Sequence, residues 1–173
     1  MTEATTRSIQ FRQPSARDGL SLNTLIERCP PLDTNSVYCN LLQTSHFADT
    51  AVVAEDENNQ LIGSITGYLL PNNPDTLFVW QVALAPEARG QGLALKMLSH
   101  LFERCEQAVN IETSISPDNI ASQRLFDRFF EQLGFTVKKK TLFEKSLHFA
   151  GQHEDEVLYR ATPPDHEHQI KQG

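Results

Sequence analysis

The sequence predicts a single-domain α+β protein in which helices flank a central mixed, mostly antiparallel sheet. Its 173 residues suit one domain, and a chain of this size buries about 70% of its unfolded surface without disulfide or metal staples. Short alternating or apolar segments bounded by turn residues predict strands. Between and after them, apolar residues recur at helical spacing. The expected order is a strand, two helices, a three-strand meander, and then helix, strand, helix, strand.

The N-terminal part opens with a strand and two helices. Residues 8–12 (SIQFR) alternate in polarity, as a half-buried strand does. Ser15 can cap a helix over residues 16–29, which two prolines then end because proline cannot continue a helix. A short second helix is expected over residues 36–43.

A meander of three strands follows. Residues 50–55 (TAVVAE) and 61–70 (LIGSITGYLL) predict two strands joined by the polar hairpin turn DENNQ. Residues 71–75 (PNNPD) predict a loop. Residues 76–85 (TLFVWQVALA) are almost all apolar, which predicts a strand that is buried on both faces.

The C-terminal part alternates helices and strands. Apolar residues at helical spacing predict an amphipathic helix over residues 92–107, and a strand is expected over residues 109–115. Ser116 and Pro117 offer the N-cap and the first position of another amphipathic helix, which Gly134 ends.

A less regular segment, residues 135–154, precedes a last strand over residues 157–162. The domain is expected to span residues 8–162, between a flexible N-terminus (1–7) and a disordered polar tail (163–173).

Composition argues against several function classes. The net charge of −7 argues against a general affinity for nucleic acid or anionic membranes and slightly favours a cationic substrate. No apolar run is long enough to cross a bilayer, and the N-terminus lacks the apolar core of a signal peptide. The 3 cysteines have neither CxxC nor Cys/His spacing, which fits reduced thiols in the cytoplasm. We interpret the spacing His166-x-His168 as incidental and expect no metal.

A glycine-rich turn joins the apolar strand to the helix that follows it. In RGQGLA (residues 89–94), glycines let the backbone come close to a ligand, and the first amides of the helix have no partner within it. Such amides favour an anion such as phosphate. The third glycine of a dinucleotide-binding fingerprint and the lysine of a P-loop are both missing. The alternative is a tight helix entry that holds no ligand.

The turn resembles motif A of the GNAT family of acyl-CoA N-acyltransferases, whose pattern Gln/Arg-x-x-Gly-x-Gly/Ala is filled by Arg89, Gly92 and Ala94. The segment NIASQRLFDRFFEQLGF (residues 119–135) resembles motif B of that family. The order of elements also matches, so the resemblance covers about residues 8–162. It implies the GNAT fold and direct transfer of an acyl group from acyl-CoA to an amine, without a metal.

The resemblance also implies which residues contact acetyl-CoA. The pantetheine arm pairs with the backbone of the central strand, and the amides of the turn grip the pyrophosphate. An N–H near Val82 holds the oxyanion of the tetrahedral intermediate, a contribution of about 3–4 kcal/mol in other enzymes. The residues expected to bind the cofactor are Gln81, Val82, Ala83, Leu84, Arg89, Gly90, Gln91, Gly92, Leu93, Ala94 and Asn119.

Three longer strings are similar to those of one GNAT subfamily, the L-2,4-diaminobutyrate acetyltransferases of ectoine biosynthesis. They span residues 30–47, 65–94 and 153–160. This similarity implies transfer of acetyl from acetyl-CoA to the γ-amine of L-2,4-diaminobutyrate, which gives N4-acetyl-L-2,4-diaminobutyrate and CoA. It also implies a homodimer.

A diamine acceptor requires acidic groups and a route for its proton, because an alkyl ammonium with a pKa of about 10 must be deprotonated before it attacks. Asp33 lies in a proline-bounded loop, a plausible lid, and can hold an ammonium; alternatively it caps the next helix. Glu156 can hold an ammonium or accept its proton, and His153 can orient the amine or relay the proton. The alternative for both is a solvated charge run, HEDE.

Trp80, the only tryptophan, walls the acceptor site if it faces the cleft; alternatively it is a core residue. Tyr38 and Asn40 in the second helix are further candidate substrate contacts.

One feature departs from the family pattern. Many GNAT enzymes carry a tyrosine in the motif B helix as general acid for the thiolate, where this chain reads Leu125-Phe126. Protonation by Tyr159, protonation by water and departure of the unprotonated thiolate all stay open. Two rival functions also stay open: a GNAT enzyme for another amine, and a non-catalytic acyl-CoA-binding module.

Overall fold

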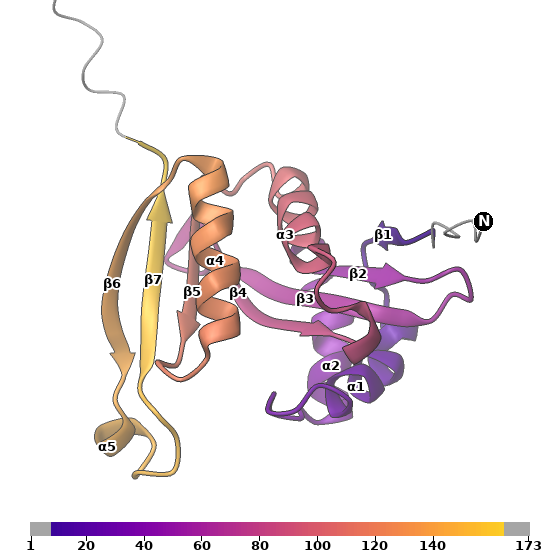
Figure 1. Cartoon of the computed structure of the whole chain (residues 1–173), viewed down its shortest axis with the longest axis horizontal. Helices are drawn as coiled ribbons and strands as arrows, with labels where there is room; N and C mark the ends of the chain where they lie inside the picture. Colours follow the sequence, from indigo (N-terminus) through magenta and orange to yellow (C-terminus); the bar gives the residue numbers. More distant parts are fainter. Residues whose placement is uncertain (1–7, 165–173) are drawn as a thin grey trace, which may run out of the picture. The chain divides into compact units, whose positions relative to one another are not determined.

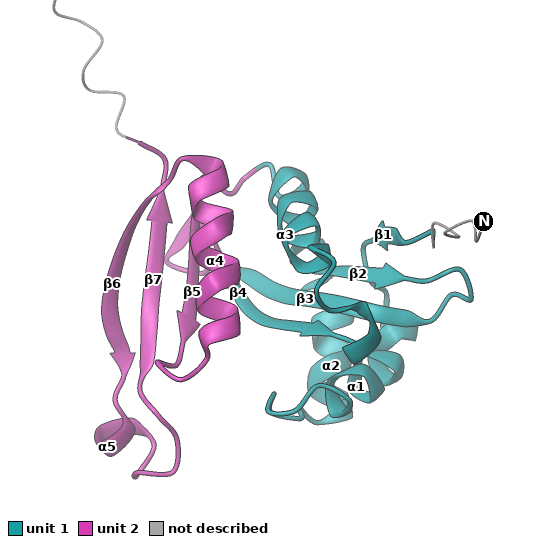
Figure 2. Cartoon of the chain, viewed as in Figure 1, with its two compact units in different colours: residues 1–68, 79–106 teal, residues 69–78, 107–173 magenta. Residues whose placement is uncertain are grey.

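A computed structural model describes residues 8–164, which form two compact units (Figure 2). Among these residues, unit 1 comprises 8–68 and 79–106, and unit 2 comprises 69–78 and 107–164. The flexible N-terminus predicted for residues 1–7, most of the predicted tail and the two tail histidines lie outside the described residues.

The predicted α+β fold is confirmed by the elements of the described chain (Figure 1). The strands are β1 (Gln10–Arg12), β2 (Val52–Glu55), β3 (Leu61–Leu70), β4 (Asn73–Leu84), β5 (Asn110–Ile115), β6 (Thr136–Phe143) and β7 (Glu156–Thr162). The helices are α1 (Gly19–Glu27), α2 (Val37–Thr44), α3 (Leu93–Arg104), α4 (Ile120–Leu133) and α5 (Lys145–His148), and the short 3₁₀ helices are η1 (Ala16–Asp18), η2 (Ala48–Thr50) and η3 (Pro86–Ala88).

The strands lie in the order β1-β2-β3-β4-β5-β7-β6, and β4 contributes residues to both units. The pairs β1–β2, β2–β3, β5–β7 and β6–β7 are antiparallel. Among residues 8–164, no helix is long and apolar enough to cross a membrane, and no group of three His, Cys, Asp or Glu residues could hold a metal ion.

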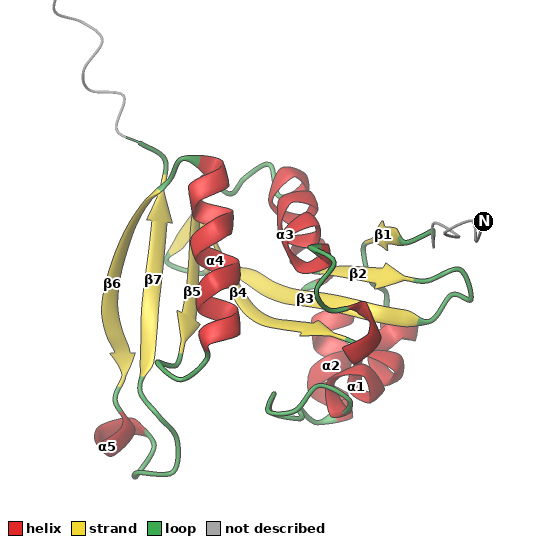
Figure 3. Ribbon diagram, in the orientation of Figure 1, coloured by secondary structure: helices red, strands yellow, loops and turns green. Residues whose placement is uncertain are grey.

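Helices cover both faces of the strands in unit 1. Helices α1 and α2 pack against each other, and α3 packs against β2 on the opposite side of the strands (Figure 3). Two glycines allow this close approach. A Cβ on Gly19 would lie 2.5 Å from the side chain of Leu41, and a Cβ on Gly63 would lie 2.9 Å from the sulfur of Met97.

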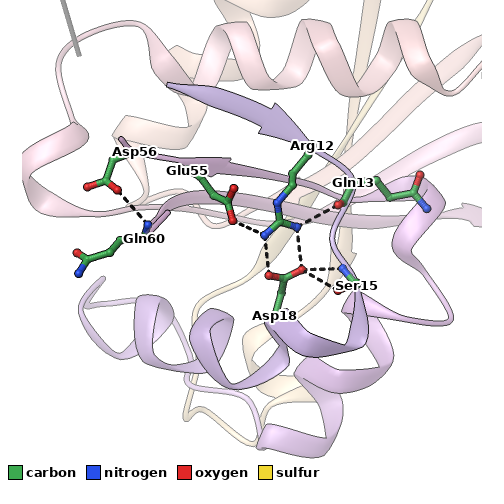
Figure 4. A network of polar contacts seen from close by, with 7 residues as sticks. All are labelled: Arg12, Gln13, Ser15, Asp18, Glu55, Asp56 and Gln60. Carbon is green, nitrogen blue, oxygen red and sulfur yellow. Dashed lines mark hydrogen bonds and ion pairs between the residues drawn. The ribbon is translucent and has the colours of Figure 1, made fainter. Parts of the chain in front are cut away.

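A polar network fastens the first strand of unit 1 (Figure 4). The guanidinium of Arg12 donates to both carboxylate oxygens of Asp18, at 2.8 and 2.9 Å, and also pairs with Glu55. The backbone N–H of Ser15 donates to Asp18 at 2.7 Å. Arg12 therefore lowers the pKa of Asp18, although partial burial acts in the opposite direction.

Several predicted boundaries are confirmed. Ser15 forms a capping box at the start of the first helical segment, although its first turn is the 3₁₀ helix η1. Strand β3 matches the predicted range, and the N–H of Asp56 donates to the carbonyl of Gln60 across the predicted hairpin turn at 3.0 Å. Gly134 ends α4 with φ of +66°, in the left-handed region that glycine adopts without strain.

The prediction for β4 is wrong in two respects. The strand begins at Asn73, inside the predicted loop, because a turn at residues 71–72 already reverses the chain. Burial on both faces holds only over residues 76–79, and the strand then becomes exposed at Trp80 and half-buried at Gln81 and Val82. The apolar run therefore continues into a segment that is open on at least one side.

Unit 2 contains the first part of β4, the strands β5, β6 and β7, and the helices α4 and α5. Helix α4 buries Phe126, Phe129 and Phe130, as its spacing predicts. Its N-cap is Asn119, whose side chain accepts from the N–H of Ser122, so the predicted cap at residue 116 is wrong.

The segment over residues 135–154 is not irregular, because it contains β6 and α5. Strand β6 lies at the edge of the sheet and pairs with β7 on one side. Its three consecutive lysines, Lys138 to Lys140, are exposed. Lys139 lies 4.2 Å above the ring of Tyr159.

Candidate active site

The glycine-rich turn lies in unit 1, between the end of β4 and the start of α3. Gly90 and Gly92 have φ values of +75° and +70°, a left-handed conformation that glycine adopts without strain. A Cβ added to either residue would meet no protein atom within 4 Å. The space beside both glycines is therefore open to a ligand.

The amides of this turn are available to a ligand. Within the described part of the chain, the backbone N–H groups of residues 90–95 form no hydrogen bond, and that of Lys96 is the first to donate back, to Gly92 at 3.2 Å. Unpaired amides at a helix N-terminus carry about half a positive charge. The arrangement suits a phosphate or pyrophosphate.

Side chains brace the turn against neighbouring elements. Arg89 Nε donates to the carbonyl of Leu84 at 3.2 Å, and Gln91 Nε2 donates to the carbonyl of Glu87 at 3.2 Å. The carboxylate of Glu87 pairs with Arg28, at the end of α1, at 2.7 Å. Arg89 itself is exposed and supplies a cation beside the free amides.

A loop between α1 and α2 carries Asp33 and is fastened to β4. Gln81 Nε2 donates to the backbone oxygen of Asp33 at 3.2 Å, and Gln81 Oε1 accepts from Asn35 Nδ2 at 3.2 Å. Asn35 Nδ2 also lies 3.4 Å from Asn40 Oδ1. The structure thus brings together three predicted residues, Asp33, Asn40 and Gln81, through Asn35, which we did not predict. Its one sequence signal is a carboxamide directly before a helix cap.

Asp33 does not cap α2. The hydroxyl of Ser36 accepts from the N–H of Cys39 at 3.0 Å and is the N-cap, so the capping alternative for Asp33 is wrong. The carboxylate of Asp33 is exposed and, within residues 8–164, forms no hydrogen bond or ion pair. Its charge is available to a ligand.

Other predicted residues of unit 1 differ in how open they are. Trp80 is 40% exposed, which excludes the alternative of a core tryptophan. Tyr38 is 71% exposed on α2 and is not part of the hydrogen-bonded group around Asn35. Val82 is half-buried and Ala83 is buried. The carbonyl of Leu84 already accepts bonds within the protein, so the amides and carbonyls before it are the better candidates for pairing with a pantetheine arm.

His153 and Glu156 lie together in unit 2, at the start of β7. His153 Nε2 is 3.9 Å from Glu156 Oε1. His153 Nδ1 is 2.7 Å from the carbonyl of Glu154, and since a carbonyl only accepts, Nδ1 carries the hydrogen. In the neutral ring, Nε2 is then a hydrogen-bond acceptor, and it faces the carboxylate of Glu156, which is also an acceptor. The ring of Phe149 packs against the imidazole, with centroids 4.7 Å apart.

The start of α4 adds an acidic group near this pair. The hydroxyl of Ser116 donates to Asp118 at 2.6 Å and lowers the pKa of Asp118. Asn119, predicted to bind the cofactor, uses its side-chain oxygen to cap α4 at Ser122.

Of the positions considered for a general acid, Leu125 is half-buried, whereas Phe126 and Tyr159 are buried. Phe126 is a core residue of unit 2, and Tyr159 is only 5% exposed beneath the ammonium of Lys139.

The chain is similar in sequence to proteins named as acetyltransferases. A model of the acetyltransferase (GNAT) family matches residues 20–135. The chain is 48% identical, over 157 residues, to the L-2,4-diaminobutyric acid acetyltransferase of Methylotuvimicrobium alcaliphilum, covering 90% of this chain and 91% of the relative. It is 45% identical, over 152 residues, to the protein of the same name from Vibrio cholerae, covering 87% of each.

A solved structure shows the same likeness. It is the diaminobutyrate acetyltransferase EctA from Paenibacillus lautus, in complex with its substrate L-2,4-diaminobutyric acid and coenzyme A. The TM-score is 0.85 at 39% sequence identity, and the match covers 91% of this chain and 96% of that one.

Proposed function

Because this chain belongs to the acetyltransferase (GNAT) family, we propose that it transfers acetyl from acetyl-CoA to the γ-amine of L-2,4-diaminobutyrate. The products are N4-acetyl-L-2,4-diaminobutyrate and CoA, a step of ectoine biosynthesis. One observation carries the proposal: the likeness, over nearly the whole chain, to an enzyme whose structure holds diaminobutyrate and CoA.

The turn in unit 1 is the proposed site for the pyrophosphate of acetyl-CoA. The free amides of residues 90–95 can donate to phosphate oxygens, and the exposed Arg89 adds a positive charge in a chain of net charge −7. A GNAT enzyme needs no metal for this step, because the amides and the arginine supply the positive field.

The pair in unit 2 is proposed to handle the amine and its proton. An ammonium donates over about 2.8–3.0 Å, so one ammonium can reach both His153 Nε2 and Glu156 Oε1, which are 3.9 Å apart. Glu156 then accepts the proton and His153 orients the amine. Asp33, whose carboxylate has no partner among the described residues, holds the second ammonium.

The neutral amine attacks the thioester carbonyl directly. An N–H near Val82 holds the oxyanion. Collapse of the intermediate expels the thiolate of CoA, and the extra proton on the nitrogen passes to water to leave the neutral amide. Because Tyr159 is buried, we propose that the thiolate leaves unprotonated or takes its proton from water. A thiol with a pKa of about 8.5 is a tolerable leaving group at neutral pH.

We also propose that the enzyme acts in the cytoplasm as a homodimer. Three free cysteines, two of them buried, support a reducing compartment. The dimer rests on the subfamily resemblance, and light scattering on the purified protein measures it.

The deciding experiment combines thiol release with product NMR. The purified protein is incubated with acetyl-CoA and diaminobutyrate, CoA is followed with a thiol reagent, and the product is assigned by NMR. We expect acetylation at the γ-amine, because it is farther from the carboxylate and can attack while the other end is gripped. An α-acetylated product would contradict the proposed orientation. Turnover only with polyamines or peptides would favour another GNAT activity, and absence of turnover would favour an acyl-CoA-binding module.

A further inference from the structure

Carboxamides, rather than charged groups, hold the loop that carries Asp33. Asn23 Nδ2 donates to the carbonyl of Asn35 at 3.0 Å. The side chain of Asn35 contacts Gln81 at 3.2 Å and Asn40 at 3.4 Å, and Gln81 in turn donates to the backbone of Asp33. We call Asn23, Asn35, Asn40 and Gln81 the carboxamide network. It links α1, the loop, α2 and β4.

The carboxamide network is not the arrangement that stability alone would favour. Asn23 is 8% exposed and Asn40 is 0% exposed. Asn40 Nδ2 is buried without an acceptor among the described residues. A buried N–H without an acceptor destabilises the fold, and apolar side chains would join the same elements without that penalty. The carboxamides instead offer directional hydrogen bonds to the backbone of the loop, which apolar side chains do not.

The network fixes the loop while leaving the charge of Asp33 uncompensated. Asp33 is the only charged residue among residues 29–36. The preceding cation, Arg28, is already paired with Glu87 at 2.7 Å. A lysine or arginine in place of a carboxamide would compete with a substrate ammonium for Asp33, whereas a neutral carboxamide holds the backbone and adds no counter-charge.

We propose that Asn35 is a positioning residue for the acceptor amine, which acts by holding Asp33, together with Gln81, where its carboxylate binds an ammonium. This inference rests on the proposed function. Asn35 itself does not touch the substrate. Its effect reaches the reaction through Asp33 alone.

A double-mutant cycle tests this dependence. The variants are Asn35→Ala, Asp33→Asn and the double variant, and the readouts are kcat, KM for diaminobutyrate and KM for acetyl-CoA. We expect Asn35→Ala to raise KM for diaminobutyrate about tenfold, or about 1.4 kcal/mol, and to leave KM for acetyl-CoA within about twofold. We expect the double variant to have the same KM as Asp33→Asn, because Asn35 acts through that carboxylate.

Asn58→Ala is the matched control, since it makes the same chemical change on the exposed β2–β3 turn and should behave as the parent. If thermal unfolding shows that Asn35→Ala folds poorly, Gln81→Met removes the bond from Asn35 Nδ2 and the bond to the backbone of Asp33, and it should also raise KM for diaminobutyrate. Only KM for diaminobutyrate is compared in this variant, because Gln81 is itself an expected cofactor contact. An unchanged KM for diaminobutyrate, or multiplied effects in the double variant, would overturn the inference. If the enzyme acetylates a different amine, the proposed function is wrong. The double-mutant cycle is then measured with KM for that amine, so the two failures are distinguishable.

Discussion

Replacement of Gly92 by alanine separates ligand binding from backbone strain. Gly92 has φ of +70°, and a Cβ there would meet no protein atom within 4 Å. The change therefore causes strain but no clash inside the protein. A non-glycine residue in the left-handed region costs roughly 1–2 kcal/mol, which for a domain of this size lowers Tm by about 2–8 °C.

The same Cβ projects into the space proposed for the pyrophosphate. Loss of one charge-assisted hydrogen bond costs about 1.5–3 kcal/mol, so Gly92→Ala should raise KM for acetyl-CoA about 10- to 150-fold. The assay is steady-state turnover with saturating diaminobutyrate, together with calorimetric titration of CoA.

Gly134→Ala is the matched control, because Gly134 has φ of +66° and an equally open Cβ position at the end of α4. It should lose the same stability and keep its affinity for CoA. If Gly92→Ala loses stability but binds CoA as the parent does, the phosphate reading of the turn is refuted.

Two further predictions concern carboxylates. Asp33→Asn and Glu156→Gln should each lower kcat/KM for diaminobutyrate about 10- to 150-fold. Asp33→Asn should act mainly by raising KM. Glu156→Gln should act mainly by lowering kcat, and kcat should partly recover at higher pH because more of the substrate amine is unprotonated. Effects within twofold in steady-state kinetics would make both residues surface charges. Arg12 lowers the pKa of Asp18 in the folded state, so this interaction adds stability above the unfolded pKa of about 4 and loses it as pH falls through the folded pKa. Tm measured between pH 7 and pH 3 should fall less steeply in Asp18→Asn than in the parent, and parallel curves would contradict the assignment.

Local sequence patterns were sufficient for most of the fold. The strand over residues 61–70 and the glycine that ends α4 follow from alternation and from a left-handed cap, both of which involve only neighbouring residues. The turn at Gly90 and Gly92 is also local, and its left-handed φ values agree with the glycine pattern.

Elements that depend on contacts beyond the local sequence pattern were harder to predict. Strand β6 was missed because three consecutive lysines hide its alternation, and only pairing with β7 makes it a strand. The N-cap of α4 was assigned three residues too early, since the Ser116 hydroxyl bonds to Asp118 instead.

The candidate site shows the same division. Sequence similarity pointed to Asp33, His153 and Glu156, whereas the only signal at Asn35 is a carboxamide directly before the helix cap Ser36. Its role becomes visible only when Gln81, 46 positions away, lies beside it. A carboxamide in a loop is otherwise as well explained by solvent contact.

The three lysines of β6 have a consequence for how this protein tolerates salt. The outer edge of β6 offers backbone groups to any second strand, and lysines oppose such pairing in two ways. Mutual repulsion acts over a Debye length of about 8 Å at 0.15 M ionic strength but only about 3 Å at 1 M. The dehydration of an ammonium on burial is not removed by salt. Charge repulsion between lysines therefore weakens in concentrated salt, whereas the cost of dehydrating an ammonium remains. This cost still opposes pairing between the β6 edges of two copies when repulsion alone would no longer prevent it.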